Sequence, residues 1–152
     1  MDIFFNGIQF ETSFLFAMPI SQLLLVSVMD WVIGDIHGCL LELELLLEQI
    51  PRKDKLVFLG DYIDRGPESA GVVDRLLKEK ERSIFIKGNH ETMFLSYFKS
   101  PANERIPDSA FIMNGGEITL HSYGLKRGDQ DFKKIPTIHR KFYQNLKNLK
   151  DS

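Results

Sequence analysis

Three segments of this sequence carry an oxygen-bearing side chain directly after a glycine, in the pairs Gly34-Asp35, Gly60-Asp61 and Gly88-Asn89. Two histidines, His37 and His90, stand on the same segments. Carboxylate, amide and imidazole groups together suit divalent ions such as Mn, Fe, Zn or Ni. The three segments therefore predict a metal centre, in which Asp61, on the middle segment, is placed to bridge two ions.

Further charged and polar residues stand on the same segments. Arg65 follows Asp64 on the middle segment. A guanidinium always keeps its charge, and an imidazole such as that of His90 can act as an acid near neutral pH. The three segments are therefore expected to form an active site.

Short strands must position these residues. Apolar runs at residues 30–33, 55–59 and 83–87 each stop at one of the three glycines and are typical of buried parallel strands. Asp61 lies 26 residues after Asp35 and 28 residues before Asn89, about one βαβ unit in each case. Because parallel strands bind ligands at their carboxyl ends, the three turns are expected to meet at one edge of the sheet.

Helices are predicted between the strands. Residues 40–50 are rich in Leu and Glu, which are good helix formers. Residues 67–80 place four apolar side chains on one stripe, with Pro67 suited to a first turn: Val72, Val73, Leu76 and Leu77. The expected fold class is α/β.

Composition excludes several classes of protein. The 152 residues are 43% hydrophobic and 26% charged, with a net charge of -2, which excludes a disordered tail, a collagen-like repeat and a disulfide scaffold. The lone Cys39 favours a reducing compartment, so we expect a cytoplasmic location. The basic stretch 126–150 is interpreted as a solvated helix face and not as a nucleic-acid site, so no nucleic-acid partner is expected. The sequence contains neither a phosphate-binding loop of P-loop type nor a dinucleotide fingerprint.

The first 28 residues fit no standard template. Residues 14–28 are mostly apolar, but Pro19 and Gln22 interrupt them, and no Lys or Arg precedes them as in a secretory signal. We treat residues 1–28 as a doubtful apolar extension, with Met29 as the favoured start. The alternatives are a weak signal or anchor, and hence a membrane-anchored protein, and an ordered extension of the domain, although a membrane partner is not expected.

The three motifs resemble those of the calcineurin-like metallophosphoesterases. They read Gly-Asp-Ile-His-Gly from Gly34, Gly-Asp-Tyr-Ile-Asp-Arg-Gly from Gly60, and Gly-Asn-His-Glu from Gly88. The Asp-Arg-Gly of the second motif is similar to that of the phosphoprotein phosphatase branch. Residues 114–124 are similar to the corresponding segment of the bacterial members, and this branch includes bacterial serine/threonine protein phosphatases and symmetrical diadenosine tetraphosphatases. The resemblance implies that residues 29–152 form part of a phosphoesterase domain: the N-terminal βαβαβ half of an αββα sandwich, followed by helices.

The resemblance also implies a role for each motif residue. Two divalent ions, manganese in the first place, would be held by Asp35, His37, Asp61 and Asn89, with a hydroxide between them attacking phosphorus. His90 would protonate the leaving oxygen while Asp64 orients its ring, and Arg65 would bind the phosphate oxygens.

Two departures from the family pattern qualify this reading. The position of a second arginine in eukaryotic members is Met93 here. The family also completes its second metal site with two histidines further along the chain, and neither His121 nor His139 is expected to replace them. We expect His121 to have a packing or surface role in a helical region and His139 to be solvated or capping.

The expected function is hydrolysis of phosphoesters, most of all in a phosphoprotein. The alternatives are a dinucleoside polyphosphate as substrate, or a truncated, non-catalytic fragment of such an enzyme. A sheet of three parallel strands with one face uncovered also favours self-association.

Overall fold

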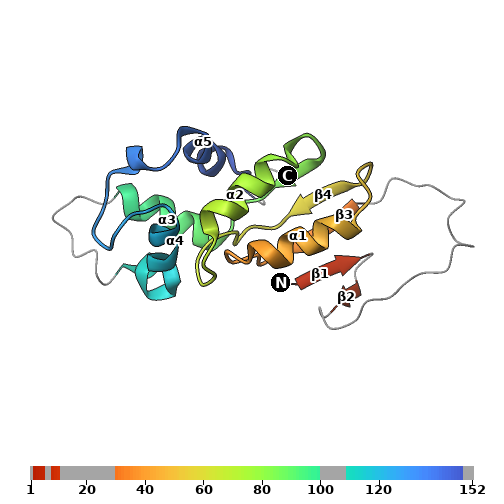
Figure 1. The fold of residues 1–152 in the computed structure, drawn as a ribbon, viewed down its shortest axis with the longest axis horizontal. Helices are drawn as coiled ribbons and strands as arrows, with labels where there is room; N and C mark the ends of the chain where they lie inside the picture. The colour runs from red at the N-terminus through yellow and green to blue at the C-terminus, as the bar shows by residue number, and fades with distance from the viewer. Residues whose placement is uncertain (1, 6–7, 11–29, 100–108, 149–152) are drawn as a thin grey trace, which may run out of the picture.

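The computed structural model describes residues 2–5, 8–10, 30–99 and 109–148, and its centre is one sheet (Figure 1). The strand order is β2-β1-β3-β4-β5. The last three strands are parallel and correspond to the three predicted runs: β3 (Asp30–Gly34), β4 (Lys55–Phe58) and β5 (Ser83–Phe85). The predicted βαβαβ arrangement is therefore confirmed.

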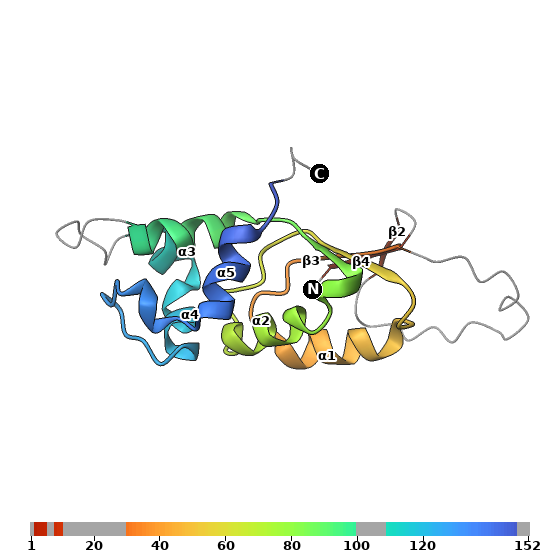
Figure 2. The same ribbon diagram turned by 90° about the horizontal axis from the view of Figure 1, so that it is seen from above.

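Two helices connect the parallel strands. Helix α1 (Leu40–Gln49) follows β3, and α2 (Ser69–Leu77) follows β4. Helix α2 begins two residues after Pro67, so the proline precedes the first turn. Both helices lie on the same side of β3 and β4 (Figure 2), as right-handed crossovers require for consecutive parallel strands.

The helices after β5 gather beyond the carboxyl ends of the strands (Figures 1 and 2). They are α3 (Asn89–Lys99), α4 (Glu117–Ser122) and α5 (Thr137–Asn145). Short helical turns complete the described part: Lys80–Arg82, Phe132–Lys134, and a π-helical turn at Ile112–Gly116 that leads into α4. None of the helices in the described residues is both long and apolar enough to cross a bilayer.

A hairpin near the N-terminus extends the sheet. Strands β1 (Asp2–Phe5) and β2 (Ile8–Phe10) pair with each other, and β1 pairs antiparallel with β3. These seven residues lie in the 1–28 extension, for which an ordered structure was one alternative and no strand was predicted. The apolar segment 14–28 lies outside the described residues.

The hydrophobic core lies on the helix-covered face of the sheet. Ile33, Leu56 and Phe58 on β3 and β4 have at most 1% of their surface exposed, and they pack in one cluster with Leu43 of α1 and Val72 of α2. Alternate residues of a strand point to opposite faces. This alternation anchors the sheet to the helices through one face only.

The opposite face carries a row of apolar side chains. Val32, Val57 and Ile84 are aligned across β3, β4 and β5. Ile84 has 44% of its surface exposed, and Leu59, two residues beyond Val57, has 41%. Aligned apolar side chains that remain in contact with water favour association with another apolar surface.

We predict that the isolated chain self-associates through this row and that Ile84→Lys weakens the association at least tenfold. A lysine in the row would bury its charge without a partner, at a cost above about 1.4 kcal/mol. Sedimentation velocity over a range of protein concentrations measures the effect. Ile138→Lys, at a 58% exposed position on α5, is the matched control. A sharp, reversible melting transition that does not depend on concentration would contradict the prediction.

Candidate metal centre

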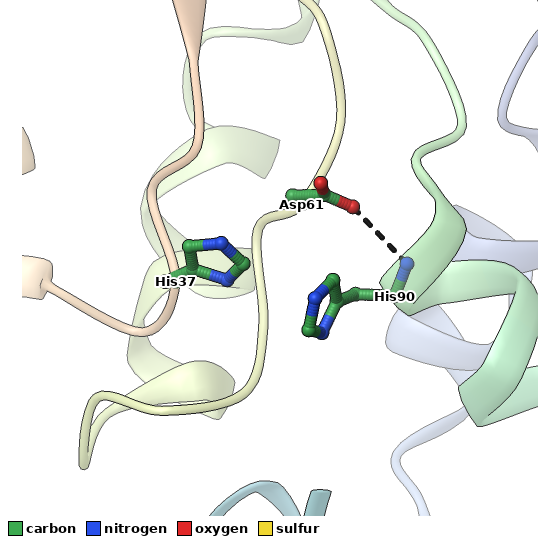
Figure 3. A group of neighbouring side chains, drawn as sticks. All are labelled: His37, Asp61 and His90. Carbon is green, nitrogen blue, oxygen red and sulfur yellow. Dashed lines mark hydrogen bonds between the residues drawn. The ribbon is translucent and has the colours of Figure 1, made fainter. Parts of the chain in front are cut away.

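The loops that follow β3, β4 and β5 meet at one edge of the sheet, as their spacing predicts. His37 N donates to the carbonyl of Asp61, and Gly38 N donates to the carbonyl of Tyr62, each at 2.8 Å. His37, Asp61 and His90 each bring one ligand atom within 4.8 Å of the others (Figure 3). This group joins three loops that lie up to 53 positions apart in the sequence.

The second and third loops touch through their backbones. A Cβ atom on Gly88 would lie 2.2 Å from Asp61 Oδ1 and 2.4 Å from Asp61 N. Both distances are far shorter than any non-bonded contact, so only glycine fits at this position. The glycine of the third motif therefore allows Asp61 to approach the start of α3.

Glu91 ties the same two loops together. Its side chain is fully buried. Oε2 accepts from Asp61 N at 2.9 Å and Gly88 N at 3.0 Å, and Oε1 accepts from Tyr62 N at 2.9 Å. Burial raises the pKa of the Glu91 carboxyl to about 7, against the lowering effect of its amide donors. The sequence analysis assigned this residue no role, although its place beside His90 in the third motif was a signal.

Backbone strain is concentrated in these loops. Five non-glycine residues of the described chain have positive φ angles: Asp35, His37, Asp61, Asp64 and Arg65, at 47°, 48°, 54°, 71° and 67°. Such left-handed conformations cost free energy and collect at functional sites. All five were predicted as site residues from the motifs, but the strain itself has no signature in the sequence.

Hydrogen bonding places the lone pair of the His37 ring on its outer nitrogen. Its Nδ1 donates to the carbonyl of Ile63 at 3.0 Å, since a carbonyl oxygen can only accept. The lone pair of the neutral ring is then on Nε2, which accepts from Arg65 Nη1 at 2.9 Å. A backbone carbonyl behind Nδ1 is a common support for a metal-binding histidine.

His90 and Asp64 form a buried pair. Nδ1 of His90 lies 2.7 Å from Asp64 Oδ2, and the two side chains are 3% and 0% exposed. Burial raises the pKa of Asp64, while hydrogen bonds from Thr119 and His90 oppose the shift. The rings of His37 and His90 meet edge to face with centroids 4.7 Å apart.

Asp35 and Asn89 complete the set of predicted ligands. Asp35 is exposed on the first loop and does not belong to the group of three. Asn89 is the first residue of α3, and its amide lies beside Asp61. In the amide orientation that satisfies both groups, Nδ2 donates to Asp61 Oδ2 at 3.0 Å. The backbone N of His90 also donates to Asp61, at 3.1 Å (Figure 3).

The donor set at this edge fits a divalent transition metal. Imidazole nitrogens and a carboxylate are mixed nitrogen and oxygen donors, which suit Mn, Fe, Zn or Ni better than Ca or Mg. Arg65 adds a positive fork, since its Nη2 also lies 3.5 Å from Nε2 of His90. The arrangement can bind a cation and an anionic group side by side, with a histidine–aspartate pair within reach of both.

The two remaining histidines lie outside this group. His121 is exposed in the last turn of α4, in agreement with the expected surface role. The expectation that His139 is solvated or capping is wrong, because it is only 3% exposed. Its Nε2 bonds to Asp74 Oδ1 at 2.9 Å and its Nδ1 bonds to the Tyr123 hydroxyl at 3.0 Å. The solvated helix face expected for residues 126–150 gave no indication of these polar partners.

Comparison with known proteins identifies similar sequences. A family model described as calcineurin-like phosphoesterase matches residues 31–151. Serine/threonine-protein phosphatase 1 of Salmonella typhimurium is 41% identical over 90 residues, which cover 57% of this chain and 38% of the relative. An asymmetrical bis(5'-nucleosyl)-tetraphosphatase of Anoxybacillus flavithermus is 29% identical over 128 residues, covering 75% of this chain and 49% of the relative.

One solved structure, described as a candidate diadenosine tetraphosphatase, is 26% identical, with a TM-score of 0.48. It covers 77% of this chain, which in turn spans 42% of that structure. This chain therefore spans half or less of the length of the relatives it matches.

We predict that Gly88→Ala lowers the free energy of unfolding by about 2–3 kcal/mol, because its Cβ would force the second and third loops apart. The variant should also bind Mn²⁺ more weakly, since Asp61 moves away from His90. Denaturant unfolding and calorimetric titration with Mn²⁺ measure the two effects. Gly34→Ala is the control, because its Cβ would meet only Leu59 Cδ1 at 3.9 Å. Equal stability of the two variants would contradict the prediction.

Proposed function

Because this chain belongs to the calcineurin-like phosphoesterase family, we propose that it is a metal-dependent phosphoester hydrolase of the serine/threonine protein phosphatase type. The observation that carries the proposal is the buried His90–Asp64 pair beside the His37, Asp61 and His90 group. His90 supplies a positioned proton donor, His37 and Asp61 supply ligands for a cation, and Arg65 supplies a fork for phosphate oxygens.

In this proposal Asp35, His37, Asp61 and Asn89 hold two divalent ions, of which manganese is the first choice. When bound, such ions polarise the phosphoryl group and activate water. His37 offers Nε2 because Ile63 engages Nδ1. Asp61 lies between the first and third loops, which supports a bridging position.

The protein's own side chains supply the remaining steps. Asp64 accepts from Nδ1 of His90, so Nε2 is the nitrogen that delivers a proton to the leaving oxygen. The carboxylate also stabilises the ring in its charged form. Arg65 binds the phosphoryl oxygens through Nη1 and Nη2, which already face the two histidines.

A phosphoprotein is the proposed substrate, supported by the similarity to the Salmonella phosphatase. A dinucleoside polyphosphate is the second candidate, because the similarity to the Anoxybacillus tetraphosphatase extends over more of this chain, 75% against 57%. In both cases the cleaved bond joins phosphorus to oxygen. The lone thiol of Cys39 supports a cytoplasmic location.

We predict that the purified chain with Mn²⁺ hydrolyses an aryl phosphate and that Asp61→Asn abolishes the activity. The substitution removes the central carboxylate charge but keeps the size of the side chain. Hydrolysis is followed by release of the aryl alcohol, and Asp129→Asn, at a surface position beside Lys134, is the matched control.

The outcomes distinguish three hypotheses: a protein phosphatase, a dinucleoside polyphosphate hydrolase and a non-catalytic fragment. Activity in wild type and control, but not in Asp61→Asn, supports the proposal. Mn²⁺ binding without hydrolysis points to a non-catalytic fragment and contradicts it. Parallel assays with a phosphoserine peptide and diadenosine tetraphosphate decide between the two substrates.

We also predict that Arg65→Lys weakens phosphate binding about tenfold or more, because an ammonium group cannot reproduce the two parallel hydrogen bonds of a guanidinium. Calorimetric titration of the Mn²⁺-loaded chain with inorganic phosphate measures this without turnover. Arg52→Lys is the control, since the Arg52 side chain is 81% exposed and pairs with Glu79 instead. Unchanged phosphate affinity in Arg65→Lys would remove Arg65 from the proposed site.

A further inference from the structure

Behind Asp64 lie two buried hydroxyl groups to which the family motifs assign no role. Thr119 of α4 and Ser69 of α2 are both fully buried. Thr119 Oγ1 lies 2.6 Å from Asp64 Oδ1, 2.9 Å from Asp64 N and 2.9 Å from Ser69 Oγ. One threonine hydroxyl thus contacts both the carboxylate and the backbone of Asp64.

The donors and acceptors of this group allow only one direction of hydrogen bonding when Asp64 is ionised. A carboxylate only accepts, so the single proton of the Thr119 hydroxyl goes to Oδ1. Thr119 Oγ1 then accepts from Asp64 N and from Ser69 Oγ. Asp64 Oδ2 remains free to accept from Nδ1 of His90. A continuous series of hydrogen bonds therefore runs from Ser69 through Thr119 and Asp64 to the imidazole of His90.

The segment that carries Thr119 also contacts the neighbouring residue of the second loop. Gly115 has a φ of +94°, and a Cβ there would lie 3.1 Å from Arg65 N. Ser122, one turn after Thr119, accepts from Ala70 N at 3.2 Å and so docks α4 on the start of α2. Residues 115–122 therefore pack against the segment that carries Asp64 and Arg65.

We propose that Thr119 is a positioning residue: its hydroxyl, supported by Ser69, holds Asp64 so that His90 keeps its proton on Nδ1 and directs Nε2 toward the metal centre. This inference rests on the proposed function insofar as His90 acts as the proton donor. Positive φ leaves the loop at Asp64 strained, so the loop needs an outside support to stay in this conformation. Thr119, 55 residues further along the chain, provides it.

Thr119→Val tests the inference, because valine keeps the shape and removes the hydroxyl. In the metal-free chain at alkaline pH, nitrogen NMR of the His90 ring should show the Nδ1–H form in wild type and in Thr119→Ser. Thr119→Val should show a mixture of the two tautomers. Thr137→Val, at an exposed position on α5, is the matched control. An unchanged His90 tautomer in Thr119→Val would overturn the inference.

Turnover provides a second measurement. Proton donation matters most for a poor leaving group, so Thr119→Val should lower kcat/KM for an alkyl phosphate about tenfold more than for p-nitrophenyl phosphate. Equal losses on both substrates would indicate a merely structural role and overturn the inference. If Thr119→Val does not fold, Ser69→Ala, which keeps the Thr119–Asp64 bond, should shift the tautomer and the substrate ratio in the same direction to a smaller extent.

The His90 tautomer and the turnover measurement test the role of Thr119 and the proposed function separately. A wild-type chain that hydrolyses neither substrate contradicts the proposed function, while the tautomer measurement still tests Thr119. An unshifted tautomer in an active chain contradicts only the role of Thr119.

Discussion

Glu91 accepts hydrogen bonds from three backbone amides that belong to two different loops, and the candidate metal centre depends on this contact. The amides of Asp61, Tyr62 and Gly88 are brought together around one buried carboxylate. Without it, the buried amide of Tyr62 would lose its partner, at a cost of about 1–3 kcal/mol. The absence of a Cβ on Gly88 allows the two loops to come this close, and Glu91 then holds them there.

The strained loops gain their support from distant parts of the chain. Left-handed conformations at five non-glycine residues persist only where the surroundings determine them. Backbone bonds from the first loop to Asp61 and Tyr62 provide part of that support. Helix α4 provides another part through Thr119. The site is thus stabilised from behind by two hydroxyls and a carboxylate that are all buried.

The two faces of the sheet differ in how they are covered. One face of the sheet is packed against α1 and α2, and this packing fixes where the strands end. The other carries the row Val32, Val57 and Ile84, with Ile84 substantially exposed. The metal centre lies at the carboxyl edge of the sheet, where its loops follow the strands that this packing holds.

The three parallel strands, the helices between them and the identity of the residues at the sheet edge were predictable from residue types and spacing. They were predictable because these features are local: apolar runs of strand length end in glycine, and each is followed by ligand-type side chains at regular spacing. The pairing of the N-terminal hairpin with β3 escaped prediction because it depends on a partner strand more than 20 residues away. The hairpin itself had a local signal that was not used: Asn6-Gly7, between two apolar runs, is typical of a two-residue hairpin turn.

The contacts that hold the site were not predictable and are visible in the folded structure alone. The roles of Glu91 and Thr119 depend on contacts across 30 and 55 residues of sequence, and no local pattern specifies which buried amide or carboxylate a side chain will meet. The same reason explains His139, whose bonds to Asp74 and Tyr123 bury a histidine expected in solvent. Residue types and spacing establish which chemical groups converge, whereas the direction of each hydrogen bond is set by packing between elements distant in the chain.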